Sequence, residues 1–360
     1  MINKSRSYAI AKHIKNLEVK SMKAVGLTQY LPIDNENSLL DIEIPKPTAQ
    51  GKDLLVQVKA ISVNPVDYKV RSPQDKVESE PRILGWDAAG IVVEVGEEVT
   101  EFQPGDEVYY AGDITRPGSN SEFHLVDARI VGRKPQNLDF AYAAAFPLTG
   151  ITAWEALFER LNIDKTGADA GKSILIINGA GGVGSIAIQI AKKLAKLNVI
   201  ATASRPETIA WCQKMGADEV VNHRNNLAEE IEKIGYQNVD YILCLNDTDG
   251  HWQAMTKAIK PQGIICSIVE NEQPLDMGTL KSKSASFVWE FMFTRSMYQT
   301  EDIAEQSNLL NELSQLIEDG AIVTTCNEVV KPIDAQNLRD VHQRLEKGRT
   351  IGKIVLAEWN

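Results

Sequence analysis

The sequence NGAGGVG, residues 178–184, decides the fold of this chain. Its glycines at 179, 181 and 184 have the G-x-G-x-x-G spacing, and it lies between an apolar run at 173–177 and a helix-like run at 185–197. A strand, a glycine turn and a helix in this order bind phosphate, because the turn leaves the backbone bare and the free N–H groups of the helix N-terminus attract anionic oxygens. The alternative is a glycine-rich turn with no ligand. The pattern around the turn favours dinucleotide binding.

Strand-like and helix-like segments alternate after about residue 150. Apolar strands are expected at 173–177, 199–203, 219–222, 240–245 and 263–269, with helices between them. This alternation is typical of a doubly wound parallel sheet, whose ligand crevice lies at the carboxyl ends of the strands. Residues 22–130 show short strands separated by turns, as in a barrel-like or sandwich domain. The predicted fold class is therefore α/β, with a mostly-β domain beside a Rossmann-type sheet.

The residues after the second strand of that sheet indicate which dinucleotide binds. Ser204 and Arg205 stand where an NAD-selective site usually carries Asp or Glu for the ribose hydroxyls. A guanidinium suits a phosphate, and no carboxylate that would repel one appears before Glu207. We therefore predict NADPH (NADP) rather than NADH. The alternative, that Ser204 caps the helix expected at 206–215 and Arg205 is a solvated charge, is compatible with this role.

Composition narrows the class of protein further. The net charge of −11 disfavours binding to nucleic acid or to an anionic membrane surface, and no apolar run is long enough to span a membrane. The four cysteines are scattered without metal-type spacing, which favours the reducing cytoplasm. Residues 1–21 carry an excess of basic side chains, and we expect them to form a loosely packed N-terminal extension.

Several motifs carry a family resemblance, in order from about Met22 to the end of the sequence. They are ISVNPVD at 61–67, GWDAAGIV at 85–92, FQPGDEV at 102–108, PLTGITAW at 147–154, the glycine turn and GKIVL at 352–356. Together they resemble the medium-chain dehydrogenase/reductase superfamily, most of all its zinc-independent quinone oxidoreductase branch and the proteins called zinc-type alcohol dehydrogenase-like. The resemblance implies a discontinuous GroES-like catalytic domain over 22–150 and 286–360, and a Rossmann cofactor domain over 151–285.

The residues of this chain contradict the zinc in that family name. Zinc alcohol dehydrogenases hold the catalytic metal with a Cys, a His followed by Glu, and a second Cys. The matching places here are Asn64, Trp86-Asp87 and Leu148, and neither an amide nor an indole replaces thiolate or imidazole. The four-cysteine loop of the structural zinc is also missing, since residues 111–121 contain no Cys or His. We therefore predict no metal.

The resemblance also implies where the reacting groups lie. It places Asn64 and Thr149 beside the nicotinamide ring, where an amide and a hydroxyl orient the ring or donate to a developing oxyanion. Tyr68 is the candidate proton donor, with Tyr110 and His124 as substitutes. The alternatives are a turn role for Asn64 and a structural role for His124.

The implied cofactor contacts lie at the glycine turn and at the strand ends. The pyrophosphate is expected at Gly181, Gly182 and Val183, the 2′-phosphate at Ser204 and Arg205, the adenine end at His223, and the ribose and nicotinamide at Asn246, Ile268 and Val269, with Lys353 as a weaker assignment. For His223 the alternative is an ordinary loop residue.

These assignments predict a chemical activity. Without a metal Lewis acid, a conjugated acceptor is easier to reduce than a simple carbonyl, because the charge left by hydride addition is delocalised. We therefore expect an NADPH-dependent reductase whose small-molecule substrate is a quinone or an α,β-unsaturated carbonyl. The alternatives are a reductase of an enoyl thioester or aldehyde, and a low-turnover NADPH-binding sensor or interaction protein.

The oligomeric state is predicted from one apolar segment. Residues 286–293 are expected to form an edge strand, and an exposed edge favours pairing in a homodimer. Trp289 and Phe291 in this segment either fill that interface or line the substrate pocket.

Overall fold

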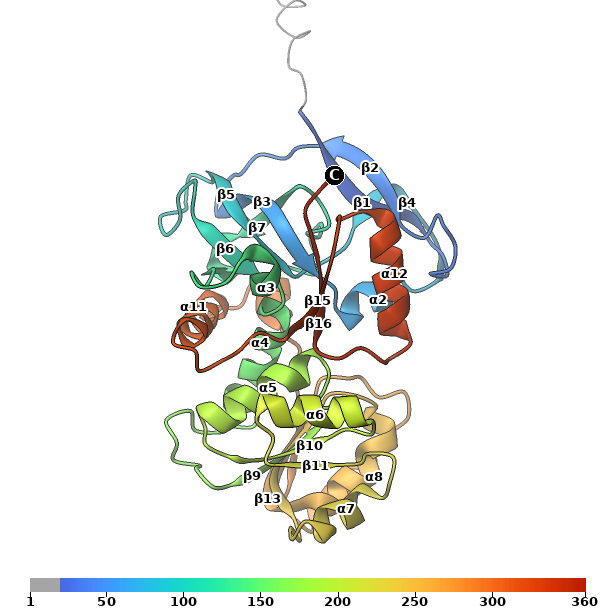
Figure 1. The fold of residues 1–360 in the computed structure, drawn as a ribbon, viewed down its shortest axis with the longest axis vertical. Helices are drawn as coiled ribbons and strands as arrows, with labels where there is room; N and C mark the ends of the chain where they lie inside the picture. Colours follow the sequence, from blue (N-terminus) through green and yellow to red (C-terminus); the bar gives the residue numbers. More distant parts are fainter. Residues whose placement is uncertain (1–19) are drawn as a thin grey trace, which may run out of the picture.

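The chain forms an upper and a lower lobe that meet at α4 (Pro147–Trp154) and α5 (Gly182–Lys193), as Figure 1 shows. The computed structural model describes residues 20–360. Together the lobes confirm the predicted α/β class, with a mostly-β lobe above a parallel sheet. Among the described residues, no helix is long and apolar enough to cross a membrane.

The lower lobe is a six-stranded parallel sheet in the order β11-β10-β9-β12-β13-β14. The strand order changes direction between β9 and β12, which places a ligand crevice at the carboxyl ends of these strands. The strands are β9 (Ser173–Ile177), β10 (Asn198–Thr202), β11 (Glu219–Val221), β12 (Val239–Cys244), β13 (Ile259–Ser267) and β14 (Ser286–Trp289). Besides α5, the helices are α6 (Pro206–Met215), α7 (Leu227–Lys233), α8 (Thr248–Ala258), α9 (Gly278–Lys281) and α10 (Thr294–Tyr298).

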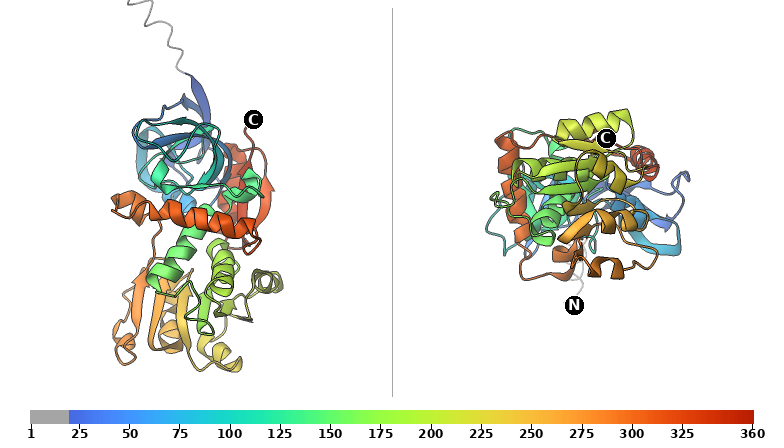
Figure 2. Two further views of the ribbon diagram at one scale, coloured as in Figure 1. Left: turned by 90° about the vertical axis from the view of Figure 1, so that its left-hand side faces the viewer. Right: turned by 90° about the horizontal axis from the view of Figure 1, so that it is seen from below.

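The upper lobe is built around β3 (Asp53–Ser62), which pairs with β5, β7 and β16. Its other strands are β1 (Ser21–Tyr30), β2 (Leu40–Pro45), β4 (Gln74–Ile83), β5 (Ala88–Val95), β6 (Glu107–Tyr110), β7 (Phe123–Asp127), β8 (Val131–Arg133), β15 (Cys326–Val330) and β16 (Lys353–Ala357). Its helices are α2 (Pro65–Arg71), α3 (Phe140–Ala144), α11 (Glu305–Glu318) and α12 (Ala335–Glu346). The orange-red helix α11 lies along the lower side of this lobe, against α4 and β8 (Figure 2).

Two predicted boundaries need correction. β14 pairs in parallel with β13, so residue 286 lies inside the sheet of the lower lobe and this sheet has six strands, not five. This segment joins the sheet because its backbone pairs with β13 along Ser286–Trp289, and α11 follows later in the chain and packs on β8 of the upper lobe. The second boundary is the end of the N-terminal extension predicted at 1–21. Residues 1–19 lie outside the described part of the chain, but Ser21 already begins β1, and the carbonyl of Lys20 accepts a hydrogen bond from the Lys46 amide.

A buried pair of carboxyl groups joins α4 to the end of β14. Glu155, in the π-helical turn that extends α4, lies close to Glu290, and both side chains are nearly fully buried. Burial and the neighbouring Glu155 raise the pKa of Glu290 to about 9. The surrounding charged groups are Glu159, Arg160, Arg295 and Asp302. With four carboxyls and two guanidinium groups, the cluster retains a shared proton at neutral pH.

Replacement of Glu290 by glutamine is expected to stabilise the protein more at pH 9 than at pH 6. The native pKa of about 9 lies above the ordinary value of 4.5. The native state therefore holds a proton that the unfolded state has lost, and wild-type stability falls as the pH rises between these values. Glu290→Gln removes that titration. Urea unfolding at both pH values measures the difference in the free energy of unfolding.

Glu312→Gln, which removes the carboxylate of an exposed pair with Lys165, is the control. A Glu290→Gln difference that is independent of pH would contradict this expectation.

Candidate active site

The Asn64 side chain lies buried at the junction of the lobes, with all of its polar hydrogens used. Its Oδ1 accepts a hydrogen bond from Lys353, and its Nδ2 donates to Asp87 Oδ2 at 3.0 Å and to the carbonyl of Ser62 at 3.3 Å. An ammonium only donates, so these partners fix the orientation of the amide. In this arrangement the side chain of Asn64 has no N–H left for a developing oxyanion.

Lys353 balances two buried carboxyl groups around Asn64. Its Nζ also donates to the Val63 carbonyl at 2.9 Å and lies 3.4 Å from Asp87 Oδ2. Burial lowers the pKa of Lys353 and raises the pKa of Asp87. Burial also raises the pKa of Asp67 to about 7. Near neutral pH the carboxyl group of Asp67 is therefore close to the midpoint of its titration.

Asp67 and Asp87 are functional candidates that the sequence analysis missed. Asp67 Oδ2 accepts the amide hydrogen of Asn64 at 2.7 Å, and Asp87 Oδ1 accepts that of Leu148 at 3.1 Å. Both lie within motifs already singled out. Their burial beside Lys353 depends on β16, a strand near the other end of the sequence, so the motif alone does not give it.

The glycine turn of the lower lobe meets this cluster directly. A Cβ on Gly182 would lie 2.9 Å from Lys353 Cδ and 3.1 Å from Thr149 Cγ2. Thr149 donates its hydroxyl hydrogen to the carbonyls of Ala145 and Phe146, at 3.3 and 3.2 Å. Its oxygen can accept a further hydrogen bond but has no free hydrogen to donate. Thus four predicted site residues, Asn64, Thr149, Gly182 and Lys353, come together at the junction.

The turn forms a cradle that fits a pyrophosphate. Gly181, Gly182 and Val183 lie partly exposed at the N-terminus of α5, where the first backbone N–H groups have no acceptor within the helix. A Cβ on Gly184 would lie 2.6 Å from the carbonyl oxygens of Asn178 and Gly179, so this close approach needs glycine. The bare backbone and the free N–H groups suit the anionic centre of a dinucleotide.

Arg205 lies at the carboxyl end of β10, beside the same turn. Its Nε donates to Glu207 Oε1 at 2.7 Å, and its Nη2 donates to the Arg349 carbonyl at 3.1 Å. The N-cap of α6 is Arg205 itself, so the alternative in which Ser204 caps this helix is wrong. Ser204 is half-buried at the strand end, next to the guanidinium group.

Further basic and polar groups surround Arg205. His223 Nδ1 lies 3.1 Å from the hydroxyl of Thr202, which accepts the backbone amide hydrogen of Asn178 in the glycine turn. Burial lowers the pKa of His223, as do the nearby charges of His251, Arg224 and Arg205. The Arg205 guanidinium, paired with Glu207, and the His223 ring therefore lie near each other at the end of β10.

The predicted contacts after β12 and β13 lie at the same sheet edge. Asn246 is exposed just beyond β12, and the Ile268 amide donates to the Cys244 carbonyl at 3.2 Å. The Val269 carbonyl accepts a hydrogen bond from Thr248. The next residue, Glu270, forms an ion pair with Lys69 of α2 at 3.0 Å, which joins the two lobes across this edge.

Tyr68 lies apart from the Asn64 cluster. It lines a cavity of about 350 Å³ between α2 and the end of α12, together with Arg71 and Glu346, and no other predicted site residue lines it. Burial raises the pKa of Tyr68, with Glu346 and Glu270 adding to the effect. Its phenol is therefore held protonated.

The substitute proton donors are held inside the upper lobe. Tyr110 donates to His124 Nδ1 at 3.0 Å, and His124 Nε2 donates to the Pro117 carbonyl at 2.9 Å. Burial lowers the pKa of His124 to about 4, so the ring is neutral at physiological pH. This pair has a structural role.

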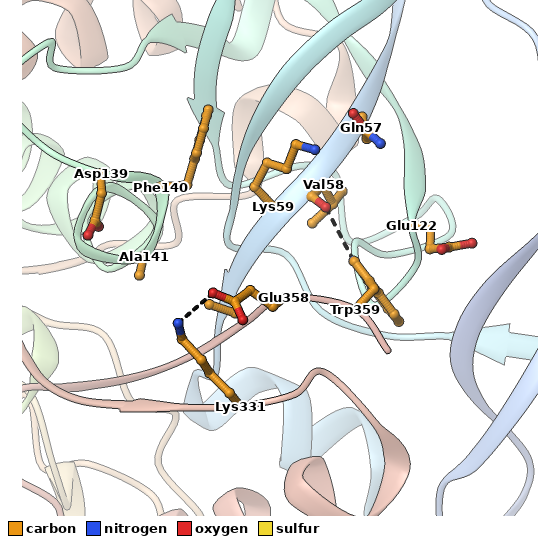
Figure 3. A pocket seen from close by; sticks show the side chains of 11 residues that line it. Gln57, Val58, Lys59, Glu122, Asp139, Phe140, Ala141, Lys331, Glu358 and Trp359 are labelled. Carbon is orange, nitrogen blue, oxygen red and sulfur yellow. Dashed lines mark hydrogen bonds and ion pairs between the residues drawn. The ribbon is translucent and has the colours of Figure 1, made fainter.

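A larger cavity of about 470 Å³ lies elsewhere on the upper lobe (Figure 3). Its labelled side chains include Lys59, Phe140 and Trp359, and an ion pair joins Lys331 to Glu358. None of the predicted site residues lines it. It is separate from the junction cluster.

The residues at the family's zinc position do not fit a metal. Lys353 donates to Asn64 Oδ1 and lies beside Asp87, so an ammonium already occupies the place of a cation. Trp86 supplies no lone pair for a metal. Within residues 20–360, no group of three or more His, Cys, Asp or Glu side chains is arranged to hold a metal ion.

Comparisons with protein families and curated relatives point to one group. The alcohol dehydrogenase GroES-like domain matches residues 50–136, and the zinc-binding dehydrogenase family matches residues 215–356. A zinc-type alcohol dehydrogenase-like protein of Staphylococcus epidermidis is 43% identical over 337 residues, which are 93% of this chain and 99% of that protein. The NADPH-dependent alkenal/one oxidoreductase of Arabidopsis thaliana is 28% identical, over 94% of this chain and 80% of that protein.

Solved structures show the same arrangement. A putative zinc-dependent alcohol dehydrogenase from Rhizobium etli has a TM-score of 0.91 and 50% identity, covering 95% of this chain and 99% of that one. The Escherichia coli quinone oxidoreductase complexed with NADPH has a TM-score of 0.76 and 25% identity, covering 93% and 99%.

Proposed function

Because this chain belongs to the medium-chain dehydrogenase/reductase superfamily, in its quinone oxidoreductase-like branch, we propose that it reduces quinones or α,β-unsaturated carbonyls with NADPH and without zinc. That it is an oxidoreductase of this superfamily follows from its relatives. The convergence of Asn64, Thr149, Gly182 and Lys353 at the junction carries the proposal. We place the activity in the cytoplasm, because all four cysteines are free and three are buried.

The proposed roles follow from the geometry of the site. When bound, NADPH supplies a hydride from its nicotinamide ring. The first N–H groups of α5 hold the pyrophosphate, and the Thr149 oxygen accepts a hydrogen bond that orients the ring. Lys353 and Asp87 hold Asn64 rigid beside them. Ile268 and Val269, which follow β13, would border the nicotinamide, and Asn246, which follows β12, would lie at the ribose.

A low-turnover NADPH-binding protein is the second candidate. It is favoured by the hydrogen bonds that already occupy the N–H groups of Asn64 and the hydroxyl hydrogen of Thr149. These groups give such a protein a cofactor site with no donor aimed at a substrate.

Cofactor oxidation against a small panel of acceptors tests the proposal. NADPH and NADH are each mixed with a benzoquinone, an enone and a saturated aldehyde, with and without a chelator. Turnover of the quinone or enone with NADPH, unchanged by the chelator, is the expected result. Turnover of the aldehyde alone would point to another carbonyl class. NADPH binding without any turnover would favour the second candidate, and loss of activity with the chelator would refute the zinc-free assignment.

Replacement of Arg205 by leucine is expected to raise the KM for NADPH about 10- to 100-fold and to leave that for NADH within about twofold. The guanidinium lies at the end of β10, where the 2′-phosphate is proposed to lie, and NADH lacks that phosphate. Steady-state kinetics with both cofactors measures the effect. Arg344→Leu, which removes an arginine paired with Glu328 on the surface, is the control. An equal loss with both cofactors would argue against phosphate recognition by Arg205.

We also propose a homodimer that forms through β14. This strand is an edge of the parallel sheet, and the apolar side chains near it are exposed: Trp289, Phe291, Met297 and Tyr298. An unpaired strand with exposed aromatic side chains favours pairing with a second copy. Trp289 contacts Phe287 of the same strand, which packs on Trp252 of α8.

Trp289→Glu is therefore expected to convert the dimer to a monomer at micromolar concentration. The charge would be buried in the interface at a high desolvation cost. Light scattering after size exclusion measures the mass, with a monomer of 39.8 kDa. Val77→Glu, at an exposed apolar position on β4, is the matched control and should leave the mass unchanged. A wild-type monomer would refute the dimer.

A further inference from the structure

Trp86 carries a buried indole N–H with no acceptor. Its side chain is 1% exposed, and its Nε1 has no hydrogen-bond partner among residues 20–360. By contrast, the indole N–H groups of Trp211, Trp252 and Trp359 each donate to an oxygen. Buried donors are nearly always paired, because an unpaired one loses its hydrogen bond to water without compensation. Trp86 Nε1 is one of several unpaired buried polar atoms among residues 20–360, and it marks a place at the junction of the lobes where an acceptor is missing.

Trp86 lies where the upper lobe meets the carboxyl edge of the parallel sheet. Its ring makes an edge-on contact with Phe293, with centroids 6.2 Å apart and an interplanar angle of 77°. Phe293 follows β14 at that edge and contacts Phe291 at 5.5 Å. Phe291 is 47% exposed, so the three rings lead from the buried junction to the surface. Doubly wound sheets bind their ligands at this edge.

The backbone ties Trp86 to the Asn64 cluster. The next residue is Asp87, whose carboxyl group accepts hydrogen bonds from Asn64 and from the Leu148 amide. A Cβ on Gly112 would lie 3.4 Å from Trp86 Cδ1, so the neighbouring backbone also restricts the indole. The indole is thus held in a fixed position relative to the groups proposed to orient the nicotinamide.

We infer that Trp86 Nε1 donates a hydrogen bond to the carbonyl or quinone oxygen of the substrate. The inference rests on the proposed reduction of conjugated carbonyls. It supplies the donor that Asn64 and Thr149 lack, because their hydrogens are bonded within the protein. The flat substrate packs along Phe293 and Phe291, and its entry requires the Trp86–Phe293 contact between the lobes to open.

The hydrogen bond matters most during hydride transfer. The hydride adds to the conjugated carbon and its electron pair displaces the π electrons toward the oxygen, so the substrate is reduced and NADPH is oxidised. Trp86 keeps its proton, and its N–H bonds more strongly to the oxygen as negative charge develops there. Water supplies the proton that completes the product.

Replacement of Trp86 by 3-benzothienylalanine tests this role with little change of shape, because sulfur replaces the N–H. The expected result is a fall of about 10- to 100-fold in kcat/KM for the quinone or enone, with the Kd for NADPH unchanged. The same replacement at Trp359, whose N–H donates to the Val58 carbonyl, is the control and should leave kcat/KM unchanged. Trp86→Phe is a second variant, with a thermal unfolding curve to confirm that it folds.

The indole ¹⁵N–¹H resonance of Trp86 gives a second readout that does not depend on turnover. It should move downfield when a saturated ketone is added in the presence of NADP⁺. Unchanged kinetics in the 3-benzothienylalanine protein, or a resonance that the ketone does not move, would overturn the inference. A wild-type protein that does not oxidise NADPH with any acceptor would overturn the proposed function instead, and the resonance would still report whether a carbonyl binds at Trp86.

Discussion

Replacement of Lys353 by methionine is expected to lower the free energy of unfolding by about 3–5 kcal/mol, because it leaves buried carboxyl groups without their cation. Lys353 is almost fully buried and contacts Asn64, Asp87 and the Val63 carbonyl. Methionine fills a similar volume but carries no charge. Activity should fall as well, by about 100-fold in kcat/KM, since Asn64 and the groups around it lose their fixed positions. Urea unfolding and steady-state kinetics measure the two effects.

A double variant separates the charge from the packing. Lys353→Met combined with Asp87→Asn removes both members of the ion pair, and it should recover more than half of the stability lost in Lys353→Met. The amide can still accept from the Leu148 backbone. If the two substitutions simply add, Lys353 does not compensate Asp87, and the proposed balance of charge around Asn64 is wrong.

Replacement of Gly182 by valine is expected to weaken NADPH binding by about 100-fold. The new Cβ would meet Lys353 Cδ at 2.9 Å and Thr149 Cγ2 at 3.1 Å, and the branched side chain would cover the free N–H groups of α5. Fluorescence titration with NADPH gives the Kd, and a thermal unfolding curve shows whether the fold is retained.

The control for Gly182 is a glycine at the start of another helix. A Cβ on Gly278, at the first position of α9, approaches only the flexible side chain of Asp276. Gly278→Val should therefore leave the Kd for NADPH unchanged. Unimpaired binding by Gly182→Val would show that the pyrophosphate does not lie at the glycine turn.

The parts of the fold that were predicted best have local causes. The predicted bounds of α6 match the observed ones, since Pro206 and Gly216 mark the two ends of this helix. β4 escaped prediction because most of its residues are polar and its conformation is set by pairing with β1. Polar strands of this kind depend on a partner that lies far away in the sequence.

The candidate site was predicted in part for a similar reason. Asn64 and Thr149 are placed beside each other, and Lys353 among the cofactor contacts, only through the family resemblance, and the structure brings the three together with Gly182. Trp86 was considered only as a failed zinc ligand. Its unpaired N–H depends on burial beneath residues of the lower lobe, which no local pattern encodes.

The long separation between Val63 and Lys353 has a consequence for how the protein is made. Translation produces Asp67 and Asp87 early, whereas the strand that carries Lys353 emerges about 290 residues after Val63. Until that strand pairs with β3, the nascent upper lobe contains two acidic groups with no lysine to neutralise them. A chain whose translation stops shortly before residue 353 therefore contains nearly all of the upper lobe but still lacks the group that compensates this charge.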